Sequence, residues 1–238
     1  MGTNYPELAR HYLRIARQVA DELRADGETI ACAVLGSVAR GDVHHKSDVD
    51  LLALVEGQGV YRWARKIVQS VVVNVASRSQ DVLERMSQDH PDTVWALQEA
   101  LILYDPQGVL QSLKEKATVS GAMAQEFLGD LLDEARSFIG KAQAALGERD
   151  QESCLLCLRQ GAMRLAEMMF YREKGRRIRP LHFWPEVQSL SSPAGFKETF
   201  AAVQGLPAAE EAWLAEMLER LEHLLPQPGD EMVVRQRE

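Results

Sequence analysis

The stretch GSVARGDVHHKSDVDLLALV, from Gly36 to Val55, decides the fold of the first half of the chain. Side chains alternate along a strand, so Asp48 and Asp50 project from the same face. Two carboxylates on one face form an oxygen-rich site suited to Mg²⁺, and a bound cation would offset their mutual repulsion. At the other end of the stretch, backbone N–H groups at Gly36 and the Ser37 hydroxyl can hold phosphate oxygens. The stretch therefore predicts a phosphate-binding site next to a metal-binding site. This combination is typical of enzymes that transfer phosphoryl or nucleotidyl groups.

The residues around this stretch predict a small sheet. Apolar residues spaced by three and four predict a helix over Pro6–Ala25. Runs of β-branched and apolar residues predict strands at Thr29–Leu35, Asp48–Val55 and Ile67–Ala76. The segment Val60–Lys66 is short and amphipathic, and its pattern does not decide between helix and strand.

The rest of the chain has helical patterns. Helices are predicted at Val82–Ser87, Val94–Leu103 and Val109–Lys116. Beyond residue 120 no strand is indicated, and helices are expected around residues 127–145, 155–169 and 208–225, before a polar tail. We therefore predict an α+β domain, a small mixed sheet flanked by helices, over residues 1–118, and an all-α helical bundle over residues 119–238.

Composition narrows the class of protein. The 238 residues are 46% hydrophobic and 26% charged, as in globular proteins, with a net charge of −8. The negative charge argues against extended binding to nucleic acid. No apolar run is long enough for a membrane span, and the N-terminus lacks the apolar core of a signal peptide. With only three cysteines, we expect a cytoplasmic protein, and a homodimer is compatible with the sequence.

The composite motif resembles the signature of the DNA polymerase β-type nucleotidyltransferase superfamily. Gly-Ser followed after ten residues by Asp-x-Asp belongs to a fuller pattern, GSxARGxxxxxSDxDL, which the chain matches at Ala39, Arg40, Gly41, Ser47 and Leu51 as well. The resemblance implies that Asp48 and Asp50 are catalytic and bind Mg²⁺. It also implies a nucleotide-binding role for four residues, Gly36, Ser37, Arg40 and Ser47.

The remainder resembles the kanamycin nucleotidyltransferase-like branch, which joins such a domain to a helical C-terminal domain that helps to bind the acceptor. The stretches Val71–Met86 and Leu101–Leu110 are similar to its third strand with the following helix and to the end of its first domain. This resemblance implies transfer of an NMP, with AMP the first choice, from an NTP to a hydroxyl of a small acceptor, with release of pyrophosphate.

The sequence departs from the family in two places. The third strand usually carries a further carboxylate, which by position falls on Val72 here, and the same face then offers only the uncharged Asn74. The family's base for the acceptor hydroxyl comes from the first helix of the helical domain, where a direct register gives Ser137. Glu134 is our candidate base, and Asp130 and Asp133 are alternatives on a helix face that solvation alone would also explain.

Two other functions remain open at this point. The acceptor could be a protein, as for nucleotidyltransferase antitoxins, or the chain could bind nucleotide with little turnover because the third carboxylate is missing. Weaker signals are a basic cluster, which suits either phosphate binding or a helix C-terminus, and the pair Cys154 and Cys157, which we expect to be core residues. The members of the basic cluster are Arg172, Lys174, Arg176, Arg177 and Arg179.

Overall fold

The computed structural model describes residues 6–179, 182–191, 193–205 and 211–226 of the chain. The chain divides into two compact units, one up to Ser120 and one from Gly121 onward. The first holds a mixed sheet with helices, and the described residues of the second are in helices and loops without a strand, so the predicted fold class is confirmed. The expected start of the last helix near Ala208 and the tail beyond Pro226 lie outside the described residues.

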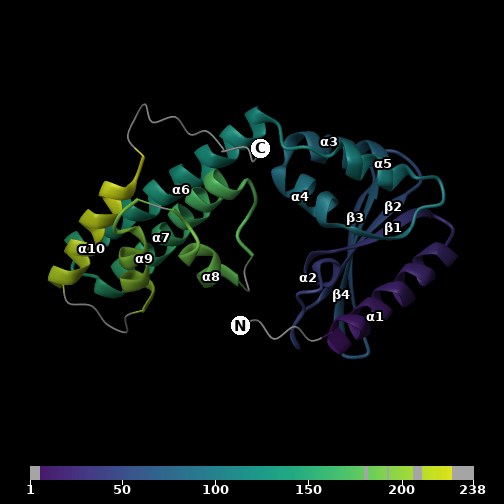
Figure 1. Cartoon of the computed structure of the whole chain (residues 1–238), viewed down its shortest axis with the longest axis horizontal. Coiled ribbons are helices and arrows are strands. Elements are labelled where there is room, and N and C mark those ends of the chain that lie inside the picture. The colour runs from purple at the N-terminus through teal and green to yellow at the C-terminus, as the bar shows by residue number, and fades with distance from the viewer. Residues whose placement is uncertain (1–5, 180–181, 192, 206–210, 227–238) are drawn as a thin grey trace. The chain divides into compact units, whose positions relative to one another are not determined.

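The first unit is built on a five-stranded sheet with the order β3-β4-β2-β1-β5 (Figure 1). The strands are β1 (Thr29–Leu35), β2 (Val49–Val55), β3 (Tyr61–Val68), β4 (Val71–Ser79) and β5 (Leu101–Tyr104). Strands β2 and β4 are parallel, and the other neighbours are antiparallel. The hairpin of β3 and β4 reverses the chain, so that β4 runs parallel to β2. Strand β4 therefore lies beside β2, which begins within the Asp-x-Asp motif.

Helices cover both faces of this sheet. The helix α1 (Pro6–Ala25) packs on one face through residues such as Ile15 and Val19, which contact the odd-numbered residues of β2 and β4. The other face carries α3 (Gln80–Asp89), α4 (Pro91–Glu99) and α5 (Val109–Lys116), as Figure 1 shows. Every residue of β2 after Asp50 is buried, so the strand is apolar on both faces.

Several predicted elements are confirmed to the residue, and two are wrong. The helix Pro6–Ala25 and the strand Thr29–Leu35 are observed as predicted. The strand predicted at Ile67–Ala76 is instead a hairpin, because Gln69 and Ser70 adopt left-handed φ angles of 51° and 65° and reverse the chain. The helix predicted at Val94–Leu103 ends at Glu99, since the apolar residues that follow form β5 on the free edge of β1.

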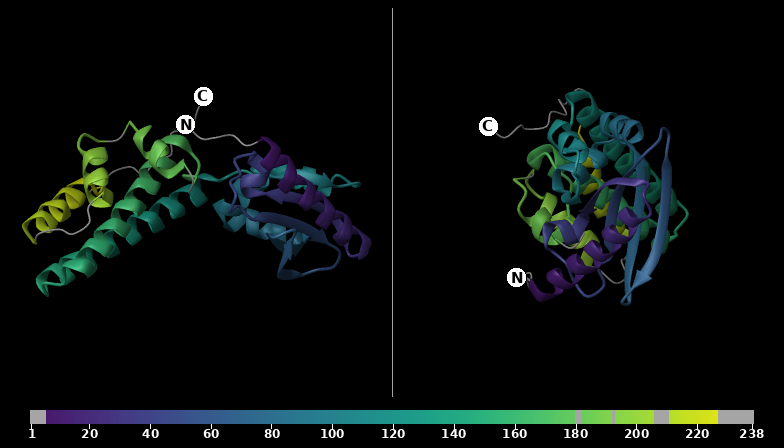
Figure 2. Two further views of the ribbon diagram at one scale, coloured as in Figure 1. Left: turned by 90° about the horizontal axis from the view of Figure 1, so that it is seen from below. Right: turned by 90° about the vertical axis from the view of Figure 1, so that its right-hand side faces the viewer.

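The second unit is an assembly of helices. They are α6 (Gly121–Gly147), α7 (Gln151–Lys174), α8 (Phe183–Gln188), α9 (Phe196–Gly205) and α10 (Glu211–Leu224). The long helices α6 and α7 run side by side (Figure 2). Their closest approach is at Gly161, where an added Cβ would lie 3.1 Å from Ile139 Cγ1 and 3.5 Å from the Ala135 carbonyl oxygen. The absence of a side chain at this position lets the two helices pack closely.

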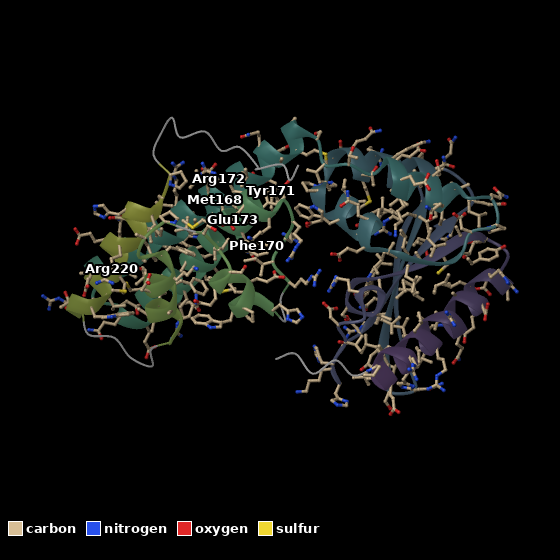
Figure 3. All side chains as sticks on the ribbon, in the orientation of Figure 1. Met168, Phe170, Tyr171, Arg172, Glu173 and Arg220 are labelled. Carbon is tan, nitrogen blue, oxygen red and sulfur yellow. The ribbon has the colours of Figure 1, made fainter. Side chains whose placement is uncertain are left out.

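The core of the second unit forms around α7. Met168, Phe170 and Tyr171 lie inside it, whereas Arg220 of α10 reaches the surface and pairs with Glu216 (Figure 3). The Tyr171 ring meets Phe127 edge to face at 5.0 Å between centroids, a geometry that aromatic pairs prefer. None of the described helices combines the length and the hydropathy that crossing a membrane requires.

Candidate active site

The two carboxylates of the Asp-x-Asp motif are bridged by one amide. The register pairs Asp50 of β2 with Asn74 of β4. The Asn74 side chain donates from Nδ2 to Asp48 Oδ2 at 2.8 Å and to Asp50 Oδ1 at 2.9 Å. Ionised carboxylates only accept hydrogen bonds, so the amide must present its nitrogen to them. Asn74 therefore holds Asp48 and Asp50 together and partly offsets their repulsion.

The backbone at Gly36 closes this group on another side. Gly36 has a φ of +63°, in the left-handed region that favours glycine, and it begins α2 (Gly36–Arg40) directly after β1. An added Cβ at Gly36 would lie 3.3 Å from Asp50 Oδ2. The Gly-Ser pair and the carboxylates are thus neighbours in space, as the spacing of the motif predicts.

Burial and like charge both act on Asp50. The pKa of Asp50 is raised above its ordinary value, mainly because the half-buried carboxyl loses solvation, although the Asn74 hydrogen bond opposes this. The negative charge of the nearby, exposed Asp48 also raises it. Tyr12 of α1 is a further neighbour, since burial and the charge of Asp48 raise the pKa of its phenol. The sequence showed Tyr12 only as part of the apolar face of a helix.

The loop between the two halves of the motif is held by its own polar groups. The Arg40 guanidinium pairs with Asp42 at 3.1 Å and with Glu99 of α4 at 2.7 Å. Ser47 Oγ accepts a hydrogen bond from the His44 N–H at 2.9 Å. Arg40 and Ser47 therefore shape the loop, and their contact with a nucleotide stays a prediction.

Val72, where we expect the family's third carboxylate, and Asn74 lie on the same face of β4. Val72 lies two residues before Asn74, opposite Ile67 of β3. Of the two, Asn74 contacts both carboxylates, and it is a neutral amide. Among the described residues, no group of three or more His, Cys, Asp or Glu side chains could hold a metal ion.

The candidate base Glu134 lies on α6 in the second unit. Its carboxylate forms an ion pair with Arg164 Nε at 2.6 Å, and Arg164 also pairs with Glu167 at 2.7 Å. This pair accounts for the position of Glu134 without a catalytic role. Of the two alternatives, Asp133 is exposed and lies 3.7 Å from Arg136.

The basic cluster is also engaged within its own unit. Lys174 pairs with Glu173 at 2.6 Å, Arg176 pairs with Glu186 at 2.9 Å, and the Arg177 guanidinium lies over the Phe127 ring at 5.4 Å from its centroid. Cys154 and Cys157 are free thiols in α7, and Cys154 is buried, as expected for a core residue. Burial is also the main reason why the pKa of Cys154 is raised.

Comparison with known proteins supports the same fold. Residues 16–116 match the family model of the nucleotidyltransferase domain, a region that contains the Gly-Ser pair, both aspartates and Asn74. Among solved structures, a nucleotidyltransferase-like protein from Exiguobacterium sibiricum aligns with a TM-score of 0.61 and 15% identity, over 88% of this chain and 73% of that one. No curated protein matches the sequence. The matches support a nucleotidyltransferase fold that is followed by helices, and they leave the kanamycin-like branch as a prediction.

Proposed function

We propose that this protein is a Mg²⁺-dependent nucleotidyltransferase that moves an NMP, AMP being the first choice, from an NTP to a hydroxyl of a small acceptor. The acceptor oxygen forms a bond to the α-phosphorus, and the bond from that phosphorus to the bridging oxygen breaks. Pyrophosphate leaves with the electron pair, and the hydroxyl proton passes to a base. The observation that supports this function is the convergence of Asp48, Asp50 and the Gly36 backbone on one point.

The donor set fits one Mg²⁺ ion. Asn74 uses one oxygen of each carboxylate, so Asp48 Oδ1 and Asp50 Oδ2 remain for a cation. Mg²⁺ is usually held by one or two carboxylates together with water and substrate phosphates. When bound there, it would offset the negative charge of the phosphates. Two acidic side chains alone are a poor set for two ions.

The start of α2 suits a phosphate. No side chain caps this helix, so its first backbone N–H groups have no capping partner. These N–H groups at Gly36 and Ser37, with the Ser37 hydroxyl, can bind phosphate oxygens next to the carboxylates. This arrangement would orient the α-phosphorus relative to Asp48 and Asp50, and catalysis of this kind is largely positioning and charge stabilisation.

The sequence register places Ser137 at the family's base position, and Glu134, one turn earlier on the same helix, is our candidate base. We test it with Glu134→Gln, which keeps the shape of the side chain but cannot take a proton. Loss of a general base lowers kcat by roughly 100- to 10,000-fold and leaves nucleotide affinity unchanged. A kcat that changes less than about threefold would show that Glu134 serves in the ion pair with Arg164 and is not the base. Loss of that exposed ion pair should lower the stability by only about 0.2–1 kcal/mol.

Asn74 favours a second candidate function, which is nucleotide binding with little turnover. A neutral amide in place of a third carboxylate leaves the nucleotide cradle complete and reduces the number of metal ligands. Incubation of the full chain with Mg²⁺, α-labelled NTPs and a panel of hydroxylated acceptors separates the candidates. Label on a small molecule supports the proposed transfer, label on a protein indicates a protein acceptor, and Mg²⁺–NTP binding without transfer indicates the second function. Neither binding nor transfer would refute both.

A further inference from the structure

The edge strand β3 has two different faces. On the face toward α1, Lys66 pairs with Glu22 at 2.6 Å and Arg62 pairs with Glu28 at 2.7 Å. The alternate residues Tyr61 and Arg65 project from the opposite face, because successive side chains of a strand point to opposite sides. The stacking of Tyr61 on its register partner Arg78, 3.5 Å from the ring centroid, shows which side chains share that face.

Arg65 lies in one row with the carboxylates. Arg65 of β3 is the register partner of Asn74 of β4, and Asn74 is the register partner of Asp50 of β2. Neighbouring strands are about 4.8 Å apart, so the Cα of Arg65 is about 10 Å from that of Asp50 across the sheet. An arginine side chain is long enough to carry its charge from β3 over β4. The row Arg65–Asn74–Asp50 therefore puts the Arg65 guanidinium within reach of a ligand bound at the carboxylates.

The charge of Arg65 is uncommitted within the part of the chain that the structure describes. The side chain is exposed, and no hydrogen bond or ion pair joins it to another described residue. Its neighbours differ, because Arg62 and Lys66 are paired with glutamates, and Arg78 donates to the carbonyl oxygens of Arg62 and Ser77. Within the described residues the Arg65 charge is therefore available for a ligand of the carboxylate site.

We propose that Arg65 binds the polyphosphate of the nucleotide and supplies positive charge that a second metal ion would otherwise provide. This inference rests on the proposed function. The two aspartates repel a polyphosphate, and one Mg²⁺ leaves a large negative charge uncompensated. The neutral Asn74 adds no ligand charge for a second ion, whereas a guanidinium beside it binds phosphate oxygens through a planar, bidentate set of donors. The site then works with one metal and one arginine.

The test compares two arginines of the same strand. Calorimetry of the full chain with Mg²⁺ and ATP, or other NTPs, gives the affinity of the wild type, of Arg65→Gln and of the control Arg62→Gln. A charge-assisted hydrogen bond is worth enough that Arg65→Gln should weaken Mg²⁺–NTP binding about 10- to 100-fold. Arg62→Gln removes the same charge from the opposite face of the sheet and should change the affinity less than about twofold, because Arg62 faces away from the carboxylates. Arg65→Lys should restore part of the affinity, since it keeps the charge without the fork.

A second variant tests the link with Asn74. In Asn74→Asp the site gains a third carboxylate, so at millimolar Mg²⁺ the added effect of Arg65→Gln should fall to about threefold or less. Equal losses for Arg65→Gln and Arg62→Gln, or an unchanged affinity for Arg65→Gln, would overturn the role of Arg65 and leave the proposed function intact. A wild type that binds no NTP with Mg²⁺ overturns the proposed function and this inference together. Thermal unfolding of each variant establishes that the fold is retained.

Discussion

The ion pairs of the helical unit and the Asp-x-Asp motif of the sheet unit use charged residues in opposite ways. In the helical unit, Glu134, Arg164 and Glu167 form one ion-pair network, and Arg176 and Glu186 form another pair. In the sheet unit, the charges at the Asp-x-Asp motif repel one another, and the Asn74 amide joins them. The charges of the first arrangement are compensated within the protein, whereas those of the second are expected to be compensated by a bound cation.

This contrast separates structural from functional residues. Where opposite charges already meet, the ion pair itself accounts for the positions of the side chains. At Asp50 the fold instead maintains a raised pKa, a glycine with positive φ and two adjacent carboxylates. Such costs are concentrated at functional sites, where they are part of the chemistry. Four predictions test whether the difference is real, from the largest expected effect to the smallest.

The first prediction concerns the carboxylates themselves. Asp48→Asn and Asp50→Asn each remove a ligand of the expected Mg²⁺. Loss of a residue that only supports a metal ligand lowers affinity roughly 10- to 100-fold. Loss of a ligand itself should lower the Mg²⁺-dependent affinity for NTP by more than that. Calorimetry with and without Mg²⁺ measures this. The control Asp89→Asn makes the same charge change at the exposed end of α3 and should bind as the wild type does. Undiminished binding in both site variants would refute the metal site.

The second prediction compares two glycines with positive φ. Gly36→Ala and Gly41→Ala should each destabilise the fold by about 1–2 kcal/mol, because alanine is strained in the left-handed region. Only at Gly36 would the added Cβ meet Asp50, since nothing lies within 4 Å of a Cβ at Gly41. NTP affinity should therefore fall about tenfold for Gly36→Ala alone, an estimate based on one lost hydrogen bond. Equal affinities for the two variants would show that Gly36 is needed only for its backbone.

The third prediction concerns a substitution that destabilises the helical unit without affecting the carboxylate site. Gly161→Ala places a Cβ 3.1 Å from Ile139 Cγ1, so it should destabilise the packing of α6 on α7 by about 1–3 kcal/mol. The control Gly140→Ala lies in α6 with nothing within 4 Å and should stabilise that helix by up to about 1 kcal/mol. Denaturant unfolding measures both. Mg²⁺–NTP affinity should stay within about twofold in each, because one unit carries the carboxylates.

The fourth prediction uses pH. The folded-state pKa of Asp50 is above its ordinary value, so folding favours the protonated carboxyl. This contribution to stability is present at low pH and is lost as pH rises through the folded pKa. Without Mg²⁺, Asp50→Asn should therefore be more stable than the wild type near pH 7, and this difference should disappear near pH 3. A variant that is less stable at pH 7 would show that the carboxylate is not strained.

Much of the site is local in sequence, and that part could be predicted. Asp48 and Asp50 are two residues apart, so the alternation of a strand is enough to place both on one face. The contact with Asn74 could not be read, because it depends on the register between β2 and β4 and on a turn without glycine at Gln69 and Ser70. Without that turn, β3 could not be predicted as a separate strand, and Arg65 could not be placed beside Asn74. The Glu134–Arg164 pair likewise needs the packing of α6 on α7, which helical periodicity does not specify.

The hairpin of β3 and β4 also bears on the order in which the site assembles during folding. Its two-residue turn makes the Arg65–Asn74 pairing local, whereas Asp50 joins Asn74 only when two strands pair across an intervening segment. Local pairings lose less chain entropy on closing, so the hairpin is expected to form before the parallel pairing of β2. The hairpin is thus expected to present the arginine and the amide first, so that the repulsion between the two carboxylates arises when β2 pairs with β4 rather than when the hairpin forms.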